Sequence, residues 1–484
     1  MKTLKDLLKD TPVTVLHGDG STTVAALAYD SRAVTRGDCF FATRGTQSDG
    51  HDFIPDAVAK GASAVVCEQL PAEPAHGVAY VVVPDAAGAL ADMAAAFYDH
   101  PSRELKLVGI TGTNGKTTTV TLLYDLVRAL GYKAGLVSTV VYKVGERLVE
   151  ATHTTPDPVR LNAMMREMAD EGCEYCFMEC SSHAIVQERT RGLDFAGGIF
   201  SNITHDHLDY HKTFAEYIRA KKLFFDGLPK GAFALTNADD RNGRVMVQNT
   251  AAAVSAYSLR AMADFRCKIV EMHLDGMLLR IDGQELWVGL LGRFNAYNLL
   301  AVYGAAVLLG LDGGEVLRVL SMLHAVSGRF EKIRAANGTT AIVDYAHTPD
   351  ALENVIQTIE EIRTPGQQLI VVCGCGGDRD RTKRPEMAAI AVKYATTAVF
   401  TSDNPRHESP EAILDDMVAG LEPGARYLRI ADRAEAIRTA VMLSRPGDII
   451  LVAGKGHETY QIVGDVKHPF DDREEIKKRF ALLN

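Results

Sequence analysis

The sequence predicts an α/β protein of three domains. A chain of 484 residues is too long for one hydrophobic core. Short apolar runs typical of buried strands alternate with helical stretches along most of the chain. After about residue 327 this alternation becomes regular, which predicts a doubly wound, mostly parallel sheet. We therefore predict domains at 1–97, 98–326 and 327–484.

Composition limits the class of protein and its partners. With 47% hydrophobic and 24% charged residues, it is typical of a soluble globular protein. The net charge of −10 argues against broad binding to nucleic acid or to anionic membranes. The first residues, "MKTLKDLLKDTP", have no apolar signal core, and the apolar stretch 296–311 is too short for a membrane span. We expect a cytoplasmic protein whose eight scattered cysteines are reduced structural thiols rather than zinc ligands.

The N-terminal segment predicts a small α/β domain. The runs "CFFAT", "ASAVVCE" and "VAYVVV" read as short strands separated by Ala-rich helical stretches. The polar, Pro-containing segment "DHPSRE" (99–104) is typical of a linker. A new domain is therefore expected to begin with the strand-like run that follows it.

A phosphate-binding loop is predicted where that run ends. "GITGTNGKTTT" (109–119) lies between a strand and a helix, so its amides and the helix N-terminus would hold phosphate. Lys116 would reach the outer phosphates and Thr117 would hold Mg²⁺. The usual Walker pattern has Gly where this chain has Ile110, so the loop is a variant. ATP is favoured over GTP because "TNADD" (236–240) lacks the lysine of the GTPase motif.

Acidic and imidazole side chains that suit Mg²⁺ follow two further strand-like runs. "FMECSSHA" (177–184) places Glu179 at the end of one, and "NITHDHLDYH" (202–211) brings together three histidines and two aspartates. A His-rich loop is more often solvated surface than a metal site. Beside a phosphate loop, however, these groups indicate a magnesium site.

One lysine is predicted to point inward. In "FAEYIRAKKLFF" (214–225), helical spacing places Lys221 on the apolar face and Lys222 on the solvent face. Burial favours the neutral, nucleophilic amine, which can capture carbon dioxide as a carbamate able to bind a metal. A lysine that snorkels to water is the alternative.

The form Gly-Thr-Asn-Gly-Lys-Thr-Thr (112–118) resembles the Mur ligase family, ATP-dependent ligases that build the peptide stem of peptidoglycan. The resemblance extends across all three segments, and folylpolyglutamate synthases are relatives. It implies catalytic roles for Lys116, Lys221 and His207. It implies metal binding by Thr117, Glu179, His207 and carbamylated Lys221. The implied ATP site comprises Gly112, Thr113, Asn114, Gly115, Lys116, Thr117, Thr118, Asn298, Arg329 and Asp344, with His347 nearby.

The resemblance also implies where a UDP-MurNAc-dipeptide binds. Its pattern is matched in "YDSRAVTRGDCFFATRGTQSDG" (29–50), "HTTPDP" (153–158) and "SSHAIVQER" (181–189). Taken singly, each serine or threonine in these stretches could equally be a helix cap or a turn residue. The implied contacts are Ser31, Thr46, Gln47, Ser48, Thr154, Thr155, Ser181, Gln187 and Arg189.

Three polar clusters follow strands of the C-terminal domain. They are "GCGGDRDRTKRP" after "QLIVV", "SDNPRH" after "TAVF" and "GKGHE" after "DIILVA". Because ligands bind at the carboxyl ends of parallel strands, we expect the clusters to converge. The predicted socket comprises Arg379, Asp403, Asn404, Pro405, Arg406, Gly454 and Glu458.

Two arginines and two carboxylates suit a ligand with two amino-acid ends. Meso-diaminopimelate is such a ligand, whereas L-lysine lacks the second carboxylate and would leave Arg406 unpaired. Among Mur ligases, Asp-Asn-Pro-Arg is characteristic of the diaminopimelate-adding enzymes, and the motif is intact at 403–406.

The resemblance implies ATP- and Mg²⁺-dependent ligation of meso-diaminopimelate to the D-Glu γ-carboxylate of UDP-MurNAc-L-Ala-D-Glu. The γ-phosphoryl group of ATP would convert the carboxylate into an acyl phosphate, which the amine then attacks. The central and C-terminal domains must close on each other for the amine to reach the acyl phosphate. A lysine-adding homologue, a folylpolyglutamate synthase-like ligase and a nucleotide-gated binding protein are the alternatives. A monomer is expected.

Overall fold

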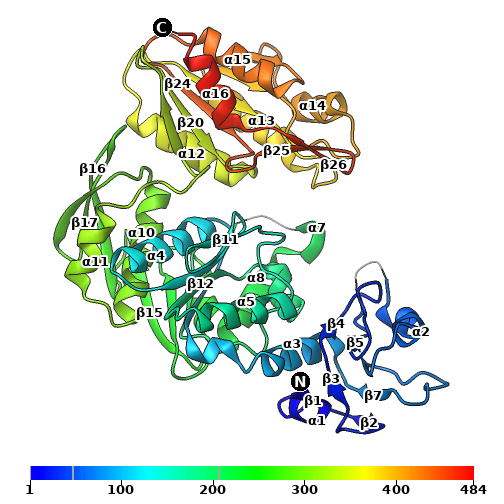
Figure 1. Ribbon diagram of the computed structural model, residues 1–484. Coiled ribbons are helices and arrows are strands. Elements are labelled where there is room, and N and C mark those ends of the chain that lie inside the picture. The colour runs from blue at the N-terminus through cyan, green and yellow to red at the C-terminus, as the bar shows by residue number, and fades with distance from the viewer. Residues whose placement is uncertain (1, 46–47, 205–207, 484) are drawn as a thin grey trace.

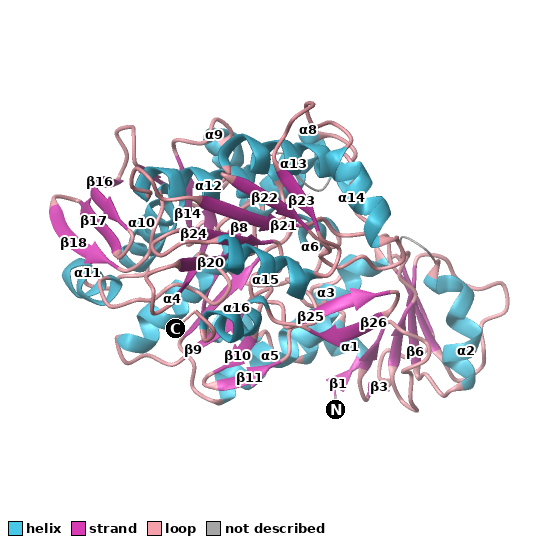
Figure 2. Ribbon diagram, turned by 90° about the horizontal axis from the view of Figure 1, so that it is seen from above, coloured by secondary structure: helices cyan, strands magenta, loops and turns pink. Residues whose placement is uncertain are grey.

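The computed structural model describes residues 2–45, 48–204 and 208–483. Figure 1 shows three α/β bodies, with the C-terminal body above the central one and the N-terminal body at the lower right. Seen from above in Figure 2, the C-terminal sheet overlies the central sheet, and the N-terminal body stands to one side. The predicted three-domain α/β fold is confirmed, while the exact domain limits stay a prediction. No helix in the described ranges is long and apolar enough to cross a membrane.

The N-terminal sheet has the order β2-β7-β6-β5-β4, parallel except for the edge strand β2. Its strands are β2 (Val15–His17), β7 (Ala79–Val82), β6 (Ala64–Cys67), β5 (Cys39–Phe41) and β4 (Leu27–Ala28). A short pair, β1 (Lys2–Thr3) and β3 (Thr23–Val24), lies beside α1 (Leu4–Leu7). The helices α2 (Ile54–Ala59) and α3 (Ala86–Phe97) complete this body, and the Ala-rich α3 is almost wholly buried.

The predicted linker 99–104 is a packed turn rather than an exposed tether. Pro101–Glu104 forms a 3₁₀ turn in which Pro101 and Ser102 are buried. The Ser102 hydroxyl accepts a hydrogen bond from the backbone N–H of Asp194 at 3.0 Å. This turn is therefore fixed to the central domain by its side chains as well as by the chain itself.

The central sheet has a parallel middle and antiparallel ends. Its order is β11-β10-β9-β12-β8-β13-β14-β15-β16-β17-β18, and the stretch from β9 to β16 is parallel. The strands are β8 (Lys106–Thr111), β9 (Ala134–Val137), β10 (Tyr142–Val144), β11 (Arg147–Val149), β12 (Tyr175–Glu179), β13 (Gly197–Phe200), β14 (Phe233–Asn237), β15 (Ala253–Ser258), β16 (Phe265–His273), β17 (Gly276–Ile281) and β18 (Gln284–Val288).

Helices cover this sheet and carry the site residues at their ends. They are α4 (Lys116–Ala129), α5 (Pro158–Asp170), α6 (Ser182–Val186), α7 (Leu208–His211), α8 (Phe214–Asp226), α9 (Gly243–Val247), α10 (Arg293–Leu308) and α11 (Gly313–Leu320). The apolar stretch 296–311 falls mostly in α10, which is buried along most of its length against α4, so the predicted core helix is present.

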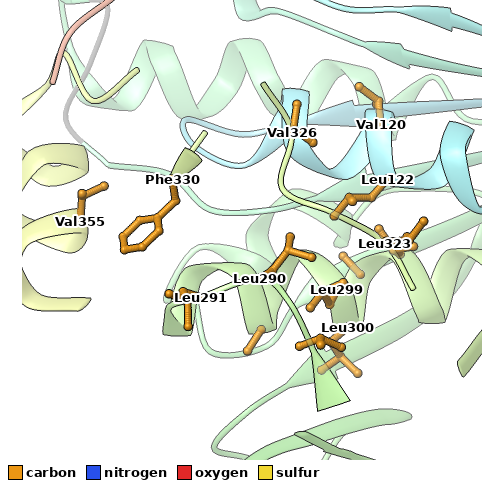
Figure 3. Packing of buried hydrophobic residues seen from close by; sticks show 14 of the residues in the cluster. Val120, Leu122, Leu290, Leu291, Leu299, Leu300, Leu323, Val326, Phe330 and Val355 are labelled. Atoms are coloured by element: carbon orange, nitrogen blue, oxygen red, sulfur yellow. The ribbon is translucent and has the colours of Figure 1, made fainter. Parts of the chain in front are cut away.

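One hydrophobic cluster continues from the central domain into the C-terminal domain. Figure 3 shows Leu299 and Leu300 of α10 packed near Leu290 and Leu323, with Phe330 lying toward Val355. Phe330 is 2% exposed and its ring lies 5.9 Å from that of Phe294. The junction between the two domains is therefore apolar as well as polar.

The C-terminal sheet has the order β19-β20-β24-β21-β22-β23, parallel except for β19. Its strands are β19 (Glu331–Arg334), β20 (Thr340–Asp344), β21 (Leu369–Cys373), β22 (Thr397–Phe400), β23 (Tyr427–Arg429) and β24 (Ile449–Ala453), followed by the hairpin β25 (Tyr460–Val463) and β26 (Val466–Pro469). The helices are α12 (Pro349–Ile362), α13 (Lys383–Tyr394), α14 (Pro410–Val418), α15 (Arg433–Leu443) and α16 (Asp472–Phe480).

Helices lie on both faces of this sheet, as the doubly wound prediction requires. Alternate strand side chains face α15 and α16 on one side and α12, α13 and α14 on the other. The ends of β21, β22 and β24 lead into the three polar clusters. This topology is what brings those clusters together.

Candidate active site

A cleft of about 1120 Å³ is lined by residues of the central and C-terminal domains. It contains the phosphate loop, Glu179 and Lys221 from the central domain. From the C-terminal domain it contains Arg329 and most of the predicted socket. Residues that lie up to several hundred positions apart in the sequence thus share one cavity.

The phosphate loop has its two glycines where no other residue fits. Gly112 has φ +152°, and a Cβ there would lie 1.9 Å from Ser201 Oγ. Gly115 has φ +88°, and a Cβ there would lie 2.4 Å from Asn298 Oδ1. Ile110, by contrast, is a fully buried residue of β8. The shifted glycine spacing therefore follows from the strand continuing to Thr111 before the loop begins.

Lys116 begins α4 and its ammonium lies over this loop. Its Nζ donates to the carbonyls of Gly112 and Thr113, each at 2.8 Å. The loop is also tied to the C-terminal domain, because Asn114 Nδ2 donates to Asp350 Oδ2 at 2.8 Å. Burial raises the pKa of Asp350. An ammonium, a helix N-terminus and turned backbone amides are the groups that bind phosphate.

Glu179 is a buried carboxylate held by neutral donors among the described residues. It is 1% exposed, and its Oε1 accepts from the Thr117 hydroxyl at 2.9 Å and from the Thr139 N–H at 2.7 Å. Its Oε2 accepts from the Thr139 hydroxyl at 3.2 Å. A buried anion whose hydrogen-bond donors among the described residues are neutral, beside a hydroxyl and a phosphate loop, fits Mg²⁺.

We predict that Glu179→Gln weakens the affinity for Mg²⁺ without unfolding the chain. Gln has the same shape and can keep hydrogen bonds to Thr117 and Thr139, but it lacks the charge. The Mg²⁺ concentration for half-maximal activity should rise by roughly 10–100-fold. A Mg²⁺ titration of activity measures this, with Glu174→Gln at the exposed end of the same strand region as control. An unchanged titration would remove Glu179 from the metal site.

Lys221 points inward as predicted. It is 1% exposed, its Nζ donates to the Gly112 carbonyl at 2.8 Å, and it lies 4.5 Å from the centre of the Tyr217 ring. Its carbamylation stays a prediction. The prediction that Lys222 faces solvent is wrong. Lys222 is 9% exposed, and its ammonium is held by Asp226 at 2.6 Å. Both faces of α8 are therefore covered at this point.

The residues predicted for the adenosine side lie at the domain junction. Arg329 Nη2 donates to the Thr117 hydroxyl at 3.1 Å, and the guanidinium lies 4.6 Å from the centre of the Tyr345 ring. Asp344 accepts from the Phe330 N–H at 2.7 Å, and burial raises its pKa to about 6. Arg329 thus reaches from the C-terminal domain to the predicted metal-binding threonine. Asn298 and His347 also line the cleft.

Most residues predicted for the muramoyl dipeptide form one connected group. Arg189 donates to the Thr155 carbonyl at 2.8 Å and to Gln187 Oε1 at 2.6 Å. The Thr155 hydroxyl donates to the Glu179 carbonyl at 2.7 Å and accepts from the Ser181 N–H at 3.2 Å. These residues and Thr154 line the cleft close to the Glu179 carboxylate.

The remaining members of that prediction lie elsewhere. Ser31 and Ser48, in the N-terminal domain, do not line the cleft. Ser31 is buried, and its carbonyl accepts from Lys60 at 2.8 Å. Thr46, Gln47 and His207 lie outside the described residues. Their predicted contacts stay untested.

The amino-acid socket forms where β22 and β24 end. Asp403 is buried, and its Oδ2 has no hydrogen-bond partner in the described part of the chain. Asn404 Nδ2 donates to Glu458 Oε2 at 2.9 Å. Asn404 Oδ1 accepts from Lys455 Nζ at 2.9 Å and from the Ile462 N–H at 3.0 Å. The amide of Asn404 therefore fixes the socket wall, while Asp403 lines the cleft with one carboxylate oxygen that no described residue bonds.

Lys455 and Thr139 were missed by sequence reasoning. Lys455 is fully buried and donates to Glu458 Oε2 at 3.0 Å, so this oxygen of Glu458 is already neutralised. Lys455 lies inside the cluster "GKGHE", three residues before Glu458, and this position is the sequence feature that could have predicted its place in the socket. Thr139 follows a strand end without any distinctive motif, and only the fold brings it to Glu179.

Arg406 and Arg379 provide the cations of the socket. Arg406 has φ +50°, and its Nη1 donates to the Gly377 carbonyl at 2.8 Å. Its backbone pairs with β25, since its N–H donates to the Ile462 carbonyl at 3.1 Å. Arg379 is exposed in the cleft. Pro405 does not line the cleft.

We predict that Gly454→Ala damages the socket selectively. Gly454 has φ +116°, and an added Cβ would lie 2.6 Å from Asp403 Oδ2. The methyl group would displace the Asp403 carboxylate oxygen that has no hydrogen-bond partner among the described residues. The KM for the amino-acid acceptor should rise by about 10-fold or more, while the KM for ATP stays within about 2-fold. Gly424→Ala, at another positive-φ glycine with open space around it, is the matched control.

If Gly454→Ala left the KM for the acceptor unchanged, the acceptor would not bind next to Asp403. If the KM values for ATP and acceptor rose together, the substitution would have disturbed the whole domain. Steady-state kinetics with one substrate varied at a time separate these results.

A phosphate loop and a polar socket for an amino acid, on two domains around one cleft, define an ATP-dependent amide ligase. Comparison with protein families agrees with this class. Residues 23–98 match the Mur ligase family catalytic domain, residues 110–306 the Mur ligase middle domain, and residues 328–456 the Mur ligase glutamate ligase domain.

The chain is 55% identical over 483 residues to the UDP-N-acetylmuramoyl-L-alanyl-D-glutamate–2,6-diaminopimelate ligase of Cytophaga hutchinsonii, with 99% of each chain covered. It is 53% identical over 479 residues to the ligase of the same name from Bacteroides thetaiotaomicron, again with 99% of each covered. The chain belongs to the Mur ligase family, as the phosphate loop predicted.

Solved structures share the architecture. A structure with the same ligase name has a TM-score of 0.71 and 31% identity, covering 100% of this chain and 99% of that one. MurF ligase from Thermotoga maritima in complex with ADP has a TM-score of 0.62 and 18% identity, covering 95% of this chain and 97% of that one. The second likeness concerns the fold alone.

Proposed function

We propose that the chain ligates meso-2,6-diaminopimelate to the D-Glu γ-carboxylate of UDP-MurNAc-L-Ala-D-Glu, using ATP. The observation that carries this is the socket at 403–406, where Asp403 and Arg406 line one cleft and a buried carboxylate oxygen of Asp403 has no hydrogen-bond partner among the described residues. Those two groups complement an ammonium and a carboxylate of one amino-acid end. The names of the full-length relatives support the same substrate pair.

The first step places the phosphates of ATP on the loop at 112–118. Lys116 and the N-terminus of α4 neutralise charge that builds up as the γ-phosphoryl group moves to the γ-carboxylate. Thr117 and Glu179 would hold Mg²⁺, which would supply further neutralisation of the phosphate charge. Arg189, near Glu179, would pair with a carboxylate of the dipeptide.

The second step is attack by an acceptor amine on the acyl phosphate. The N–C bond forms, the C–O bond to phosphate breaks, and inorganic phosphate leaves while the amine loses a proton. Asp403 would hold one ammonium of the acceptor and Arg406 its carboxylate, so that the reacting amine at the other end projects toward the central domain. The Arg329–Thr117 contact places the two domains within hydrogen-bond distance at this point.

We expect the chain to be a monomer that works in the cytoplasm. Within the same proposal, we assign His207 and carbamylated Lys221 to the metal site. Lys221 supports this by its burial beside Gly112.

Phosphate release tests the proposed reaction. The purified protein is incubated with ATP, Mg²⁺ and UDP-MurNAc-L-Ala-D-Glu, with and without meso-diaminopimelate, and the product is identified by mass spectrometry. We expect release that requires both substrates and one tripeptide product per phosphate. Release without the UDP substrate, or no release with meso-diaminopimelate, would contradict the proposal and direct the search to other acceptors, beginning with folates. A nucleotide-gated binding protein would show no acceptor-dependent release.

A further inference from the structure

A fully buried ion pair lies directly behind the amino-acid socket. Arg433 is the first residue of α15 and Asp472 the first residue of α16, and both side chains are 0% exposed. Arg433 Nε donates to Asp472 Oδ1 at 2.7 Å, and Nη2 donates to Oδ2 at 2.8 Å. The pair joins the two helices that cover one face of the C-terminal sheet.

The same guanidinium also holds the end of β24 and the segment that follows β22. Nη2 donates to the carbonyl of Ala453 at 3.0 Å, and Nη1 to the carbonyl of Ser402 at 3.4 Å. Ala453 ends β24 and precedes Gly454, while Ser402 precedes Asp403. Each carbonyl therefore belongs to the residue just before a predicted ligand contact.

The sheet itself does not join these two strands. In the order β20-β24-β21-β22, strand β21 lies between β24 and β22, so no ladder of hydrogen bonds connects them directly. Yet their loops must meet closely, because a Cβ on Gly454 would lie 2.6 Å from Asp403 Oδ2. The Arg433 guanidinium bridges across that intervening strand.

General stability does not explain the pair well. The cation at the first position of α15 is unfavourable and the anion at the first position of α16 is favourable, so the helix dipoles give the pair no clear net gain. Apolar residues in place of a buried ion pair are often as stable or more stable. Burial alone would lower the pKa of Arg433, but the charge of Asp472, with a smaller contribution from Asp403, leaves it raised. We therefore look for the role of the Arg433 guanidinium in the geometry that its hydrogen bonds fix rather than in stability.

We propose that Arg433 is a positioning residue for the amino-acid acceptor. By fixing the ends of β22 and β24 relative to each other, it sets the separation between Asp403 and the Gly454–Glu458 loop that the ammonium of the acceptor requires. The proposal rests on the proposed function, since it assigns the acceptor to this socket.

Arg433→Lys tests it. Lysine keeps the charge and can pair with Asp472, but one ammonium cannot serve a carboxylate and two separated carbonyls in the same planar geometry. We expect the KM for meso-diaminopimelate to rise by about 10-fold or more, with the KM values for ATP and the UDP substrate within about 2-fold of wild type. Arg438→Lys is the control, because Arg438 lies on the same helix and pairs with Glu435 at the surface.

A second variant covers the case in which Arg433→Lys does not fold. Arg433→Met combined with Asp472→Leu removes both charges together and fills the space with apolar atoms. This double variant also lacks the two carbonyl contacts, so the same selective rise in the KM for the acceptor is expected. Differential scanning calorimetry establishes that each variant is folded before its kinetics are compared.

The outcomes separate the two claims. A folded variant with an unchanged KM for meso-diaminopimelate would overturn the positioning role, as would an equal rise in all three KM values. If the wild-type protein itself showed no product with meso-diaminopimelate, the proposed function would fail instead.

Discussion

Lys116→Ala is expected to abolish amide formation while the protein remains folded. Lys116 is the first residue of α4 and places its ammonium over the carbonyls of Gly112 and Thr113. Phosphates bound on this loop would meet that charge as the γ-phosphoryl group transfers. Removing one group that stabilises transition-state charge reduces kcat by about 10²–10³-fold. Because the Lys116 ammonium carries a full positive charge beside the transferred phosphoryl group, we expect its removal to reduce kcat by at least that factor.

Acceptor-dependent phosphate release measures this loss. Lys133→Ala is the control, because Lys133 is an exposed lysine of the same domain whose ammonium donates to the Glu171 carbonyl. The circular dichroism spectrum and melting temperature should stay near wild type, since Ala is a good first-turn residue of a helix. Retention of ligation by Lys116→Ala would show that the loop does not bind the transferred phosphate.

Arg406→Lys is expected to impair use of meso-diaminopimelate far more than use of ATP. The guanidinium offers a planar fork that binds a carboxylate through two hydrogen bonds, whereas lysine provides one point charge. The backbone contacts of residue 406 with β25 remain in the variant. A hydrogen bond to a charged group contributes about 1.5–3 kcal/mol, so the KM for the acceptor should rise by roughly 10–100-fold.

Initial rates with each substrate varied in turn test this result. Arg429→Lys is a suitable control, because Arg429 lies in the neighbouring strand β23 and pairs with Glu411 and Asp415 away from the cleft. Equal losses for ATP and acceptor would indicate a general disturbance of the C-terminal domain. An unchanged KM for the acceptor would place the second carboxylate elsewhere, with Arg379 as the next candidate.

The sequence predicts the parts of this site that have local patterns. The strand–loop–helix at the phosphate loop and the strand ends before 403–406 and 454–458 were recognisable because apolar runs stop at polar clusters. Lys221 was predicted to be buried from helical spacing, and it is. The same spacing failed for Lys222, since periodicity assigns one face to solvent and does not see the Asp226 contact that covers it.

The remaining features depend on tertiary contacts. Thr139 holds Glu179 only because β9 and β12 are neighbours in the sheet. Asn114 meets Asp350 across 236 positions of sequence. Arg433 lies in a helix without a motif, and its role appears only when β21 is seen to separate β24 from β22. The composition of the predicted linker 99–104 likewise does not reveal that Pro101 and Ser102 are buried.

The most direct measurement compares kcat/KM for meso-diaminopimelate and for L-lysine under identical conditions, with ATP, Mg²⁺ and UDP-MurNAc-L-Ala-D-Glu saturating. When the α-amine of L-lysine is the reacting amine, its distal end offers the socket an ammonium but no carboxylate, so Arg406 is left without a partner. We predict at least about a 100-fold preference for meso-diaminopimelate, because the half-buried guanidinium of Arg406 would lose its carboxylate partner. Equal values for the two amino acids would contradict a socket built for a second carboxylate.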